Sequence, residues 1–541
     1  MLQPENTSKN YETIFSEINE GIIKIPKFQR DFVWDKEQTA KLIDSIIKGF
    51  PIGTFIFWKT KEQMRHFRNI GNANLPSIPR GDAALYVLDG QQRLTALYAA
   101  RKGLIATKDD KEIDFKELAV DLSLDPDYEE SVISTDRGDI KRSITVDELI
   151  NAGITDLIRN YTESEINKIE TYRKRLTGYN FSCIIIPEHP IDVACEVFTR
   201  INTGGTELTL FEIMVAKTYD DKKNFDLAEK YDVLIEGEGN GKCLKDAGYG
   251  TIPHSVVLQA VSANLCKQIR RKDILKLDKD RFIKSWPDVT EGIFHAVDYF
   301  RRHLRVPVSQ LLPYNALLIP FSYFFIRSEG RQATSLQNKL LVQYFWWASL
   351  TNRFTSGLEG KIGADLKRID KILKEKTPSY KGEEYTIQAN DLLWRRFSTS
   401  EAFCKAVLCL YSHFEPKSFD LDSRVTLDNS WLKQANSKNY HHFFPRKYLT
   451  TNGWGDEEAN CILNITLVDD NLNKEKIKAN APSKYMEDFS KSNPNLAETM
   501  KSHLIDDLDR YGVWLDDYEK FIQKRGKRVM KELQKRLNPS L

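Results

Sequence analysis

The chain has 541 residues, enough for about three domains that each bury a core of their own. Hydrophobic residues make up 41% and charged residues 29%, which is typical of a folded soluble protein and excludes a disordered chain or a membrane bundle. Lys and Arg number 79 and Asp and Glu 77, so the net charge of +2 does not by itself indicate a nucleic-acid-binding protein.

The sequence carries no membrane or export signal. Its most apolar stretch, residues 316–326, is much shorter than the roughly 20 residues that a membrane helix needs. The first ten residues are polar and lack an apolar signal core, so we expect a cytoplasmic protein without a membrane partner. Seven cysteines, an odd number without a CxxC pair, predict reduced and mostly buried thiols.

Strands and helices are predicted to alternate over the first two hundred residues. Asp35 and Gln38 form a capping-box pattern for a helix that ends at Gly49. Short apolar runs bounded by Gly, Asp or Pro predict strands at residues 52–58, 84–88 and 181–186.

From Thr209 to about residue 415 the pattern becomes helical. A second capping box, Thr209 with Glu212, starts this region, and residues 340–350 show helical spacing. The aromatic cluster at 344–347 could be imagined as a platform for stacking nucleic-acid bases, but we interpret it as helical core.

The predicted strand at 84–88 runs into Asp89-Gly90-Gln91-Gln92-Arg93, after which a helical pattern begins. A strand, a glycine turn and a helix start together point backbone N–H groups and the helix dipole at a ligand such as a phosphate. Arg93 would add a bidentate charge, Asp89 could hold a metal or a ribose hydroxyl, and the glutamines could contact a base, a sugar or water. The alternative is a plain Asp-Gly turn.

Two other segments favour the ligand-binding interpretation. Residues 25–34 (IPKFQRDFVW) place Gln29 and Arg30 among aromatics, and residues 198–206 (FTRINTGGT) contain Arg200 and Asn202. Together with DGQQRLTAL, and in this order, they resemble the ParB-like amino-terminal domain of GmrSD-type restriction endonucleases over roughly residues 10–220.

That resemblance implies that Asp89, Gly90, Gln91, Gln92 and Arg93 bind and hydrolyse a nucleoside triphosphate. It also implies that Gln29, Arg30, Arg200 and Asn202 line the same pocket. The sequence contains no GxxxxGK[ST] motif, which excludes a P-loop as the source of nucleotide chemistry.

Residues 440–445 (YHHFFP) predict a short aromatic strand with adjacent histidines that face opposite sides. Asn464 opens a second strand-like run, and Asn473 follows nine residues later beside a Lys-rich segment. Phosphodiester hydrolysis needs a general base, a divalent cation and a group that orients the base, and these residues could supply all three. Surface or core histidines remain the alternative for the pair alone.

This set resembles an HNH (ββα-metal, His-Me finger) nuclease, specifically the carboxy-terminal domain of the GmrSD family. The resemblance implies that His442 is the general base, that His441 and Asn473 are metal ligands, and that Asn464 fixes the loop that bears the base. It makes Lys474 and Lys476 candidates for phosphate contact. Many HNH sites have Asp where His441 stands, so Mn²⁺ or Ni²⁺ could compete with Mg²⁺.

The end of the chain is basic. From Lys520 onward eight Lys or Arg stand against Glu532 alone, a local balance of +7. Lys524, Arg525, Lys527 and Arg528 could bind DNA phosphates, or this could be a solvated helix face.

We therefore expect an α+β multidomain protein: a ParB-like α/β domain (1–208), an all-helical connection (209–415) and an HNH domain with a basic tail (416–541). The expected function is an NTP-regulated, metal-dependent endonuclease of a bacterial anti-phage system that acts on modified phage DNA. ATP, GTP or UTP would be the nucleotide, and a homodimer would ease double-strand cutting. One alternative is an NTP-hydrolysing DNA-binding sensor module that recruits a partner effector, and another is an NTPase toxin that acts on the host.

Overall fold

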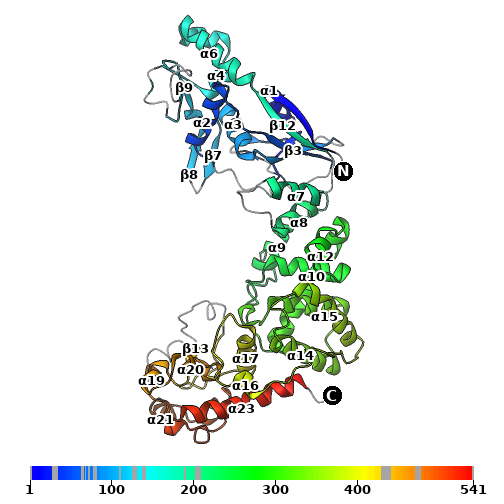
Figure 1. Cartoon of the computed structure of the whole chain (residues 1–541), viewed down its shortest axis with the longest axis vertical. Helices are drawn as coiled ribbons and strands as arrows, with labels where there is room; N and C mark the ends of the chain where they lie inside the picture. The colour runs from blue at the N-terminus through cyan, green and yellow to red at the C-terminus, as the bar shows by residue number, and fades with distance from the viewer. Residues whose placement is uncertain are drawn as a thin grey trace. The chain divides into compact units, whose positions relative to one another are not determined.

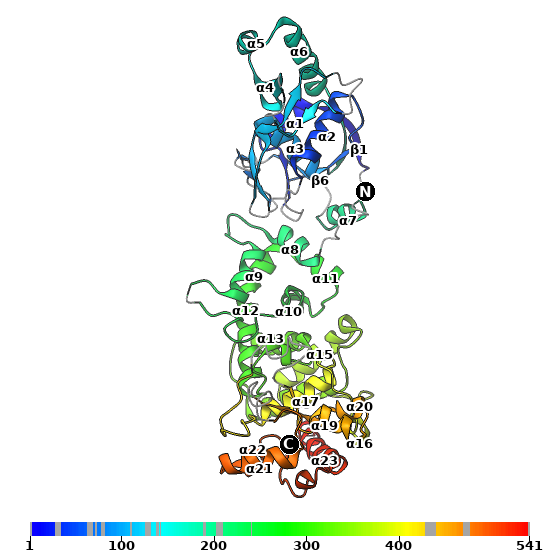
Figure 2. The same cartoon turned by 90° about the vertical axis from the view of Figure 1, so that its left-hand side faces the viewer.

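A computed structural model divides the chain into two compact units, Met1–Leu227 and Ala228–Leu541 (Figures 1 and 2). The structure describes residues 3–26, 34–61, 66, 69–70, 73–76, 82–108, 111–124, 131–136, 140, 142–187, 191–201, 209–239, 241–427, 440–468 and 477–538. Within these ranges, no helix has both the length and the apolar character needed to cross a membrane.

The amino-terminal unit is built on a mixed five-stranded sheet (Figure 1). In spatial order its strands are β1 (Glu5–Asn10), β12 (Asn180–Ile186), β3 (Phe55–Thr60), β6 (Ala84–Asp89) and β2 (Ile23–Lys24). The β12–β3 and β6–β2 pairs are parallel, whereas β1–β12 and β3–β6 are antiparallel. The strands predicted at 84–88 and 181–186 are confirmed. The strand predicted at 52–58 starts only at Phe55, because Ile52 and Thr54 turn their carbonyl groups to the Arg93 side chain.

Helices and one side of the sheet share the core of this unit. The main helices are α1 (Tyr11–Asn19), α2 (Lys36–Ile47), α3 (Gln91–Lys102) and α6 (Glu163–Thr177), the first three of which lie close together in Figure 2. The capping box predicted for α2 is present, with Asp35 and Gln38 bonded to each other's backbone. Phe55, Phe57 and Val87 point into the same core, as the two-residue period of a strand requires.

Smaller elements complete the unit. The strands are β4 (Asn69–Ile70), β5 (Ala73–Asn74), β7 (Ile105–Lys108), β8 (Lys111–Asp114), β9 (Ala119–Asp121), β10 (Ile133–Ser134) and β11 (Ser143–Thr145). The helices are α4 (Val146–Asn151), α5 (Ile154–Asn160), α7 (Ile191–Ile201) and α8 (Leu210–Thr218). α8 begins with the predicted capping box of Thr209 and Glu212.

Gly90 joins β6 to α3 through a backbone conformation that favours glycine. Its φ is +90°, and a Cβ at this position would overlap with Cδ1 of the Phe55 ring. The chain can therefore end a strand at Asp89 and begin a helix at Gln91 with a single residue between them.

Helices make up the first part of the carboxy-terminal unit. They are α9 (Leu227–Glu236), α10 (His254–Cys266), α11 (Arg271–Leu275), α12 (Lys279–Arg302), α13 (Leu318–Arg327), α14 (Ser335–Leu350), α15 (Leu358–Leu373), α16 (Ala389–Leu392) and α17 (Ala402–His413). Between residues 209 and 427 the described part of the chain has no strand, which confirms the helical prediction for the middle of the sequence. The aromatic cluster at 344–347 is buried in α14, as expected of helical core.

The rest of this unit combines a two-stranded antiparallel sheet with helices. Its elements are β13 (Tyr440–His442), α19 (Arg446–Thr451), α20 (Asp456–Ala459), β14 (Ile465–Leu467), α21 (Pro482–Ser492), α22 (Leu496–Lys501) and α23 (Tyr518–Leu537). α23, drawn in red in Figure 1, packs against α14 and α16.

Arg525 attaches α23 to the two-stranded sheet. Its side chain is fully buried, and its Nη1 donates to the carbonyl oxygens of Leu463 and Ile465, each at 2.7 Å. Nη2 and Nε donate to the carbonyl oxygen of His503, and the guanidinium lies 4.6 Å from the ring centroid of Tyr411. Among the described residues no carboxylate pairs with Arg525, so carbonyl groups and an aromatic ring compensate the buried charge.

Replacing Gly90 should destabilise the protein more than replacing a glycine that also has a positive φ but lies in free space. Gly49 has φ +73° and no heavy atom within 4 Å of the place that a Cβ would take, so Gly49→Ala should cost about 1–2 kcal/mol of unfolding free energy. Gly90→Ala should cost roughly 1–3 kcal/mol more, because its Cβ collides with Phe55. Urea unfolding of both variants measures this, and equal losses would contradict the close contact.

Arg525→Lys should destabilise the protein by about 3 kcal/mol even though the charge is kept. A lysine ammonium cannot reach the carbonyl groups of Leu463, Ile465 and His503 in the planar fork geometry that arginine offers. The matched control is Lys527→Gln at an exposed position, which should shift the unfolding free energy by no more than about 0.5 kcal/mol. Similar unfolding midpoints for the two variants would contradict a structural role for Arg525.

Candidate functional site

The β13–β14 pair carries the two adjacent histidines. His441 lies opposite Thr466, and His442 lies opposite Ile465. Because successive side chains of a strand point to opposite faces, the two imidazoles have different surroundings, as predicted. His441 is buried at 2% exposure, whereas the half-buried His442 turns towards Asn460.

Asn460 holds His442 through one ring nitrogen. Nε2 of His442 lies 2.9 Å from Oδ1 of Asn460, while Nδ2 of Asn460 donates to the carbonyl oxygen of Phe397 at 3.3 Å. Because the amide oxygen can only accept, Nε2 carries the hydrogen and Nδ1 keeps its lone pair. Burial lowers the pKa of His442 to about 4, against the opposing effect of the Asn460 hydrogen bond, so the imidazole is neutral at pH 7.

Asn460 is absent from the site residues that the sequence predicts. Its one local signal is that it lies four residues before Asn464, in the segment that follows the histidines. Its partner Phe397 is 63 residues earlier in the chain, and no sequence pattern connects the two.

Asn464 fixes the backbone that follows the histidines. Its fully buried side chain accepts from the N–H of Phe444 at 2.8 Å and donates to the carbonyl oxygens of Phe444 and Ala459, both at 2.9 Å. Its own carbonyl oxygen accepts from the N–H of Phe443 at 2.7 Å. The structure therefore brings Asn464 against the segment directly after His442.

His441 has the chemical form that a metal ligand needs. Burial lowers its pKa to about 3, so the ring is neutral at pH 7. The hydroxyl of Thr466 donates to the carbonyl oxygen of His441 at 3.2 Å, and its oxygen also lies 3.4 Å from Nδ1 of the ring. In the tautomer with the hydrogen on Nδ1, which this hydroxyl oxygen can accept, Nε2 is the nitrogen that could bind a cation.

The remaining predicted residues of this site cannot be placed. Asn473, Lys474 and Lys476 lie outside the described residues. Within the part of the chain that the structure does describe, no group of three or more His, Cys, Asp or Glu side chains could hold a metal ion.

The four basic residues predicted to contact DNA from α23 do not share one environment. Lys524 and Lys527 are exposed. The prediction is wrong for Arg525, because its guanidinium is fully buried and bonded to backbone carbonyl groups. Arg528 is mostly buried and bonds to Asp506 and Glu532, so its charge is already paired. Two of the four side chains are therefore available to a phosphate.

The DGQQR segment forms the predicted strand-to-helix turn. Nη1 of Arg93 donates to the carbonyl oxygen of Ile52 at 2.6 Å, and Nη2 donates to that of Thr54 at 3.0 Å and to the carboxylate of Asp89 at 3.2 Å. Through these hydrogen bonds the guanidinium stabilises the turn from within the fold. Gln91 and Gln92 are both buried at the start of α3.

Of the other residues predicted for the nucleotide pocket, only Arg200 can be placed. It lies on α7, is 77% exposed in its side chain and pairs with Glu196 at 2.6 Å. Gln29, Arg30 and Asn202 lie outside the described residues.

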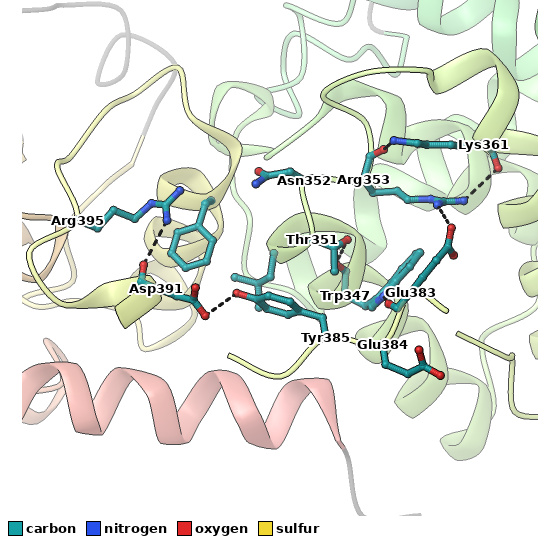
Figure 3. A pocket seen from close by; sticks show the side chains of 12 residues that line it. Trp347, Thr351, Asn352, Arg353, Lys361, Glu383, Glu384, Tyr385, Asp391 and Arg395 are labelled. Carbon is teal, nitrogen blue, oxygen red and sulfur yellow. Dashed lines mark hydrogen bonds and ion pairs between the residues drawn. The ribbon is translucent and has the colours of Figure 1, made fainter. Parts of the chain in front are cut away.

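A polar pocket of about 450 Å³ lies in the carboxy-terminal unit (Figure 3). Arg395 and Asp391 form one wall, and the hydroxyl of Tyr385 donates to the carboxylate of Asp391 at 3.1 Å. Trp347 lies across from Arg395, and Asn352 points into the space between. Arg353, which also lines the pocket, forms ion pairs with Asp365 and Glu383.

One wall of this pocket continues into the histidine site. The carbonyl oxygen of Arg395 accepts from the N–H of Ile462 at 2.8 Å, and the N–H of Phe397 donates to the carbonyl oxygen of Asn460 at 2.7 Å. The segment that lines the pocket therefore also supports Asn460, the partner of His442.

Comparison with known proteins finds a family match for the amino-terminal part of the chain. Residues 11–219 match the family model of the GmrSD restriction endonuclease, N-terminal domain, and this range includes the DGQQR turn. An uncharacterized protein of Methanocaldococcus jannaschii is 23% identical to this chain, over 94% of the chain and 93% of its own length. The matched range ends before β13 and β14. The amino-terminal part is thus similar to the GmrSD N-terminal domain, which suggests a restriction-type nuclease and implies DNA binding.

Proposed function

We propose that the protein is an NTP-regulated, metal-dependent DNA endonuclease of a bacterial anti-phage restriction system, directed at modified DNA. The cutting site would be the HNH-type arrangement on β13 and β14, with His442 as general base. The observation that carries the proposal is the geometry of His442, which Asn460 holds on one side and which precedes the loop fixed by Asn464. The GmrSD match supports the restriction class.

The neutral form and orientation of His442 suit a general base. A base must offer a free lone pair to the water that attacks the phosphate, and Nδ1 does so while Asn460 occupies Nε2. Proton transfer from that water to Nδ1 would give an imidazolium whose Nε2–H bond to Asn460 strengthens as the charge develops.

A divalent cation would be held by His441 and Asn473, with Mg²⁺ as the first candidate and Mn²⁺ or Ni²⁺ as competitors. When bound, it would supply Lewis-acid stabilisation of charge on the scissile phosphate. The neutral imidazole of His441 fits this role. Lys474 and Lys476 are proposed to contact the phosphates on either side.

The nucleotide site is proposed at the DGQQR turn. The start of α3 offers N–H groups and the positive end of the helix dipole, and Asp89, Gln91 and Gln92 stand beside it. The hydroxyl of Thr95, one turn further along, is buried without a hydrogen-bond partner among the described residues, which supports a polar ligand at this end of the helix. ATP, GTP or UTP would bind here as regulator or substrate.

Other proposed members of the nucleotide site are Gln29, Arg30, Arg200 and Asn202. Arg93 would keep the turn in shape, because both Nη atoms are bonded within the fold. A homodimer would place two cutting sites on one duplex.

His442→Ala should lower DNA cleavage by at least about 100-fold, because it removes the proposed base. The assay uses unmodified plasmid and modified phage DNA, with Mg²⁺ or Mn²⁺, and with each of ATP, GTP and UTP or none. The matched control is His303→Ala, which removes an exposed histidine of the same unit and should leave cleavage unchanged.

Unchanged cleavage by His442→Ala would remove this histidine as the base. If wild-type protein hydrolyses NTP but cuts no DNA under any of these conditions, the endonuclease proposal fails and the alternative of a sensor module takes its place.

Asn460→Ala should lower kcat by roughly 10- to 100-fold with little change in KM, because the imidazole loses the acceptor that sets its tautomer. Asn460→Asp keeps an oxygen opposite Nε2 and should retain more activity than Asn460→Ala. Nitrogen chemical shifts of the His442 ring report the tautomer directly. Equal losses for the two variants with an unchanged ring tautomer would contradict a positioning role.

A further inference from the structure

Four lysines of α23 form a continuous row on its outer side. Lys520, Lys524, Lys527 and Lys531, here called the lysine stripe, are spaced by four, three and four residues, which keeps them on one face of a helix. Lys524, Lys527 and Lys531 are exposed, and Lys520 is half-buried. Because Arg525 points into the unit, the rotation of α23 is fixed with this face outward.

No carboxylate among the described residues pairs with the stripe. In the described part of the chain, none of its four ammonium groups forms an ion pair or a side-chain hydrogen bond. The nearest acid along the helix, Glu519, is bonded to Gln523. Glu532 is buried and is shared by Arg528, Lys535 and Arg536. The positive charge of the stripe is therefore open to an external anion.

A second lysine row in the same unit shows what an ordinary solvated face looks like. Lys367, Lys371 and Lys374, on α15 and at its end, are spaced by four and three residues and are exposed. Lys374 interacts electrostatically with Asp370, which also pairs with Lys267, and Glu375 follows Lys374 directly. Mixed charge of this kind is typical of a solvated surface. Acids also adjoin the two ends of the lysine stripe, at Glu519 and Glu532, but both are bonded to other side chains.

The form of the stripe fits the backbone of a nucleic-acid duplex. Eleven residues of helix separate its ends, a length of about 16 Å, along which duplex DNA presents on the order of ten phosphate charges. Lysine is a flexible point charge without the planar fork that reads guanine, so a row of lysines suits phosphates rather than base edges.

An anionic membrane is the other extended surface of negative charge, and the packing of α23 argues against it. A helix that lies on a membrane inserts its apolar side into the lipid. In α23 this side, including Phe521, Val529 and Leu533, is buried within the unit.

We propose that the lysine stripe binds the sugar-phosphate backbone of duplex DNA without regard to sequence, and so supplies affinity outside the cutting site. The choice of DNA as the partner rests on the proposed function. The stripe replaces the predicted set in part: Lys524 and Lys527 stay, Lys520 and Lys531 join, and Arg525 and Arg528 are structural.

The test measures binding of the full chain to a fluorescent 30-base-pair duplex in EDTA, where no metal-dependent cleavage can occur. The triple variant Lys524→Gln, Lys527→Gln, Lys531→Gln is compared with Lys367→Gln, Lys371→Gln, Lys374→Gln, which removes the same charge from a row of the same length. Each phosphate contact contributes about 0.9 to the slope of log affinity against log salt, so the α23 variant should lose up to about 2.7 of that slope. Between 50 and 200 mM salt, wild-type affinity should then fall about 40-fold more than that of the variant.

Support for the stripe requires weaker binding with a flatter salt dependence for the α23 variant, near-wild-type binding for the α15 variant, and recovery when the three α23 lysines are changed to Arg. Equal binding by the two Gln variants would overturn the proposal. So would binding of wild type to vesicles with 30% phosphatidylserine together with no binding to duplex DNA.

The outcome is independent of cleavage. If His442→Ala leaves cutting unchanged, the catalytic assignment fails while the binding result for the stripe still stands. If the α23 variant binds DNA like wild type and cutting still depends on His442, the stripe alone fails.

Discussion

The buried guanidinium of Arg525 is the contact on which the arrangement of the carboxy-terminal unit depends. Its Nη1 binds the carbonyl groups of Leu463 and Ile465, the two residues that flank Asn464, and its other nitrogens bind that of His503. One side chain thus attaches α23 to the start of β14. It also fixes the rotation of α23 about its axis. Because the face that carries Arg525 is buried, the opposite face of the helix points outward. Without an acidic partner among the described residues, this position is maintained by backbone carbonyl groups whose geometry the fold itself provides.

The environment of His442 follows from contacts that extend from this point. Arg525 holds the backbone around Asn464, and the amide of Asn464 holds both the N–H and the carbonyl group of Phe444, two residues after His442. On the other side, the segment that ends in Phe397 orients Asn460, and Asn460 sets the tautomer of the ring. The same segment lines the pocket around Arg395, so anything that moved this wall would act on Asn460. A general base needs a defined lone pair more than it needs a charged neighbour, and hydrogen bonds from neutral groups provide that.

The sequence predicts well those features that depend on a few neighbouring residues. The capping boxes at Asp35 and Thr209, the strand that ends at Asp89 and the opposite faces of the two histidines are all present. Contacts between residues far apart in the sequence, such as that of Asn460 with Phe397, cannot be predicted from local patterns. For Arg525 the sequence does contain a local signal: it lies three residues after Ile522 and four before Val529, both buried, so the helical period places it on the apolar face. Its charge by itself does not distinguish it from Lys524.

The guanidinium groups of Arg93 and Arg525 stabilise the fold, whereas the ammonium groups of Lys524 and Lys527 lie at the surface. Arg93 and Arg525 both look like ligand-binding residues in the sequence, and both use their donors on backbone carbonyl groups inside the fold. A guanidinium has five donors in a fixed plane, so one side chain can satisfy several acceptors that a turn or a helix end leaves unpaired. An ammonium group is more strongly hydrated and stays at the surface on a flexible stem, which is where Lys524 and Lys527 are found. The basic residues of α23 therefore cannot be counted together as a DNA-binding surface: Arg525 fixes the rotation of the helix, and that rotation determines which lysines face an external phosphate.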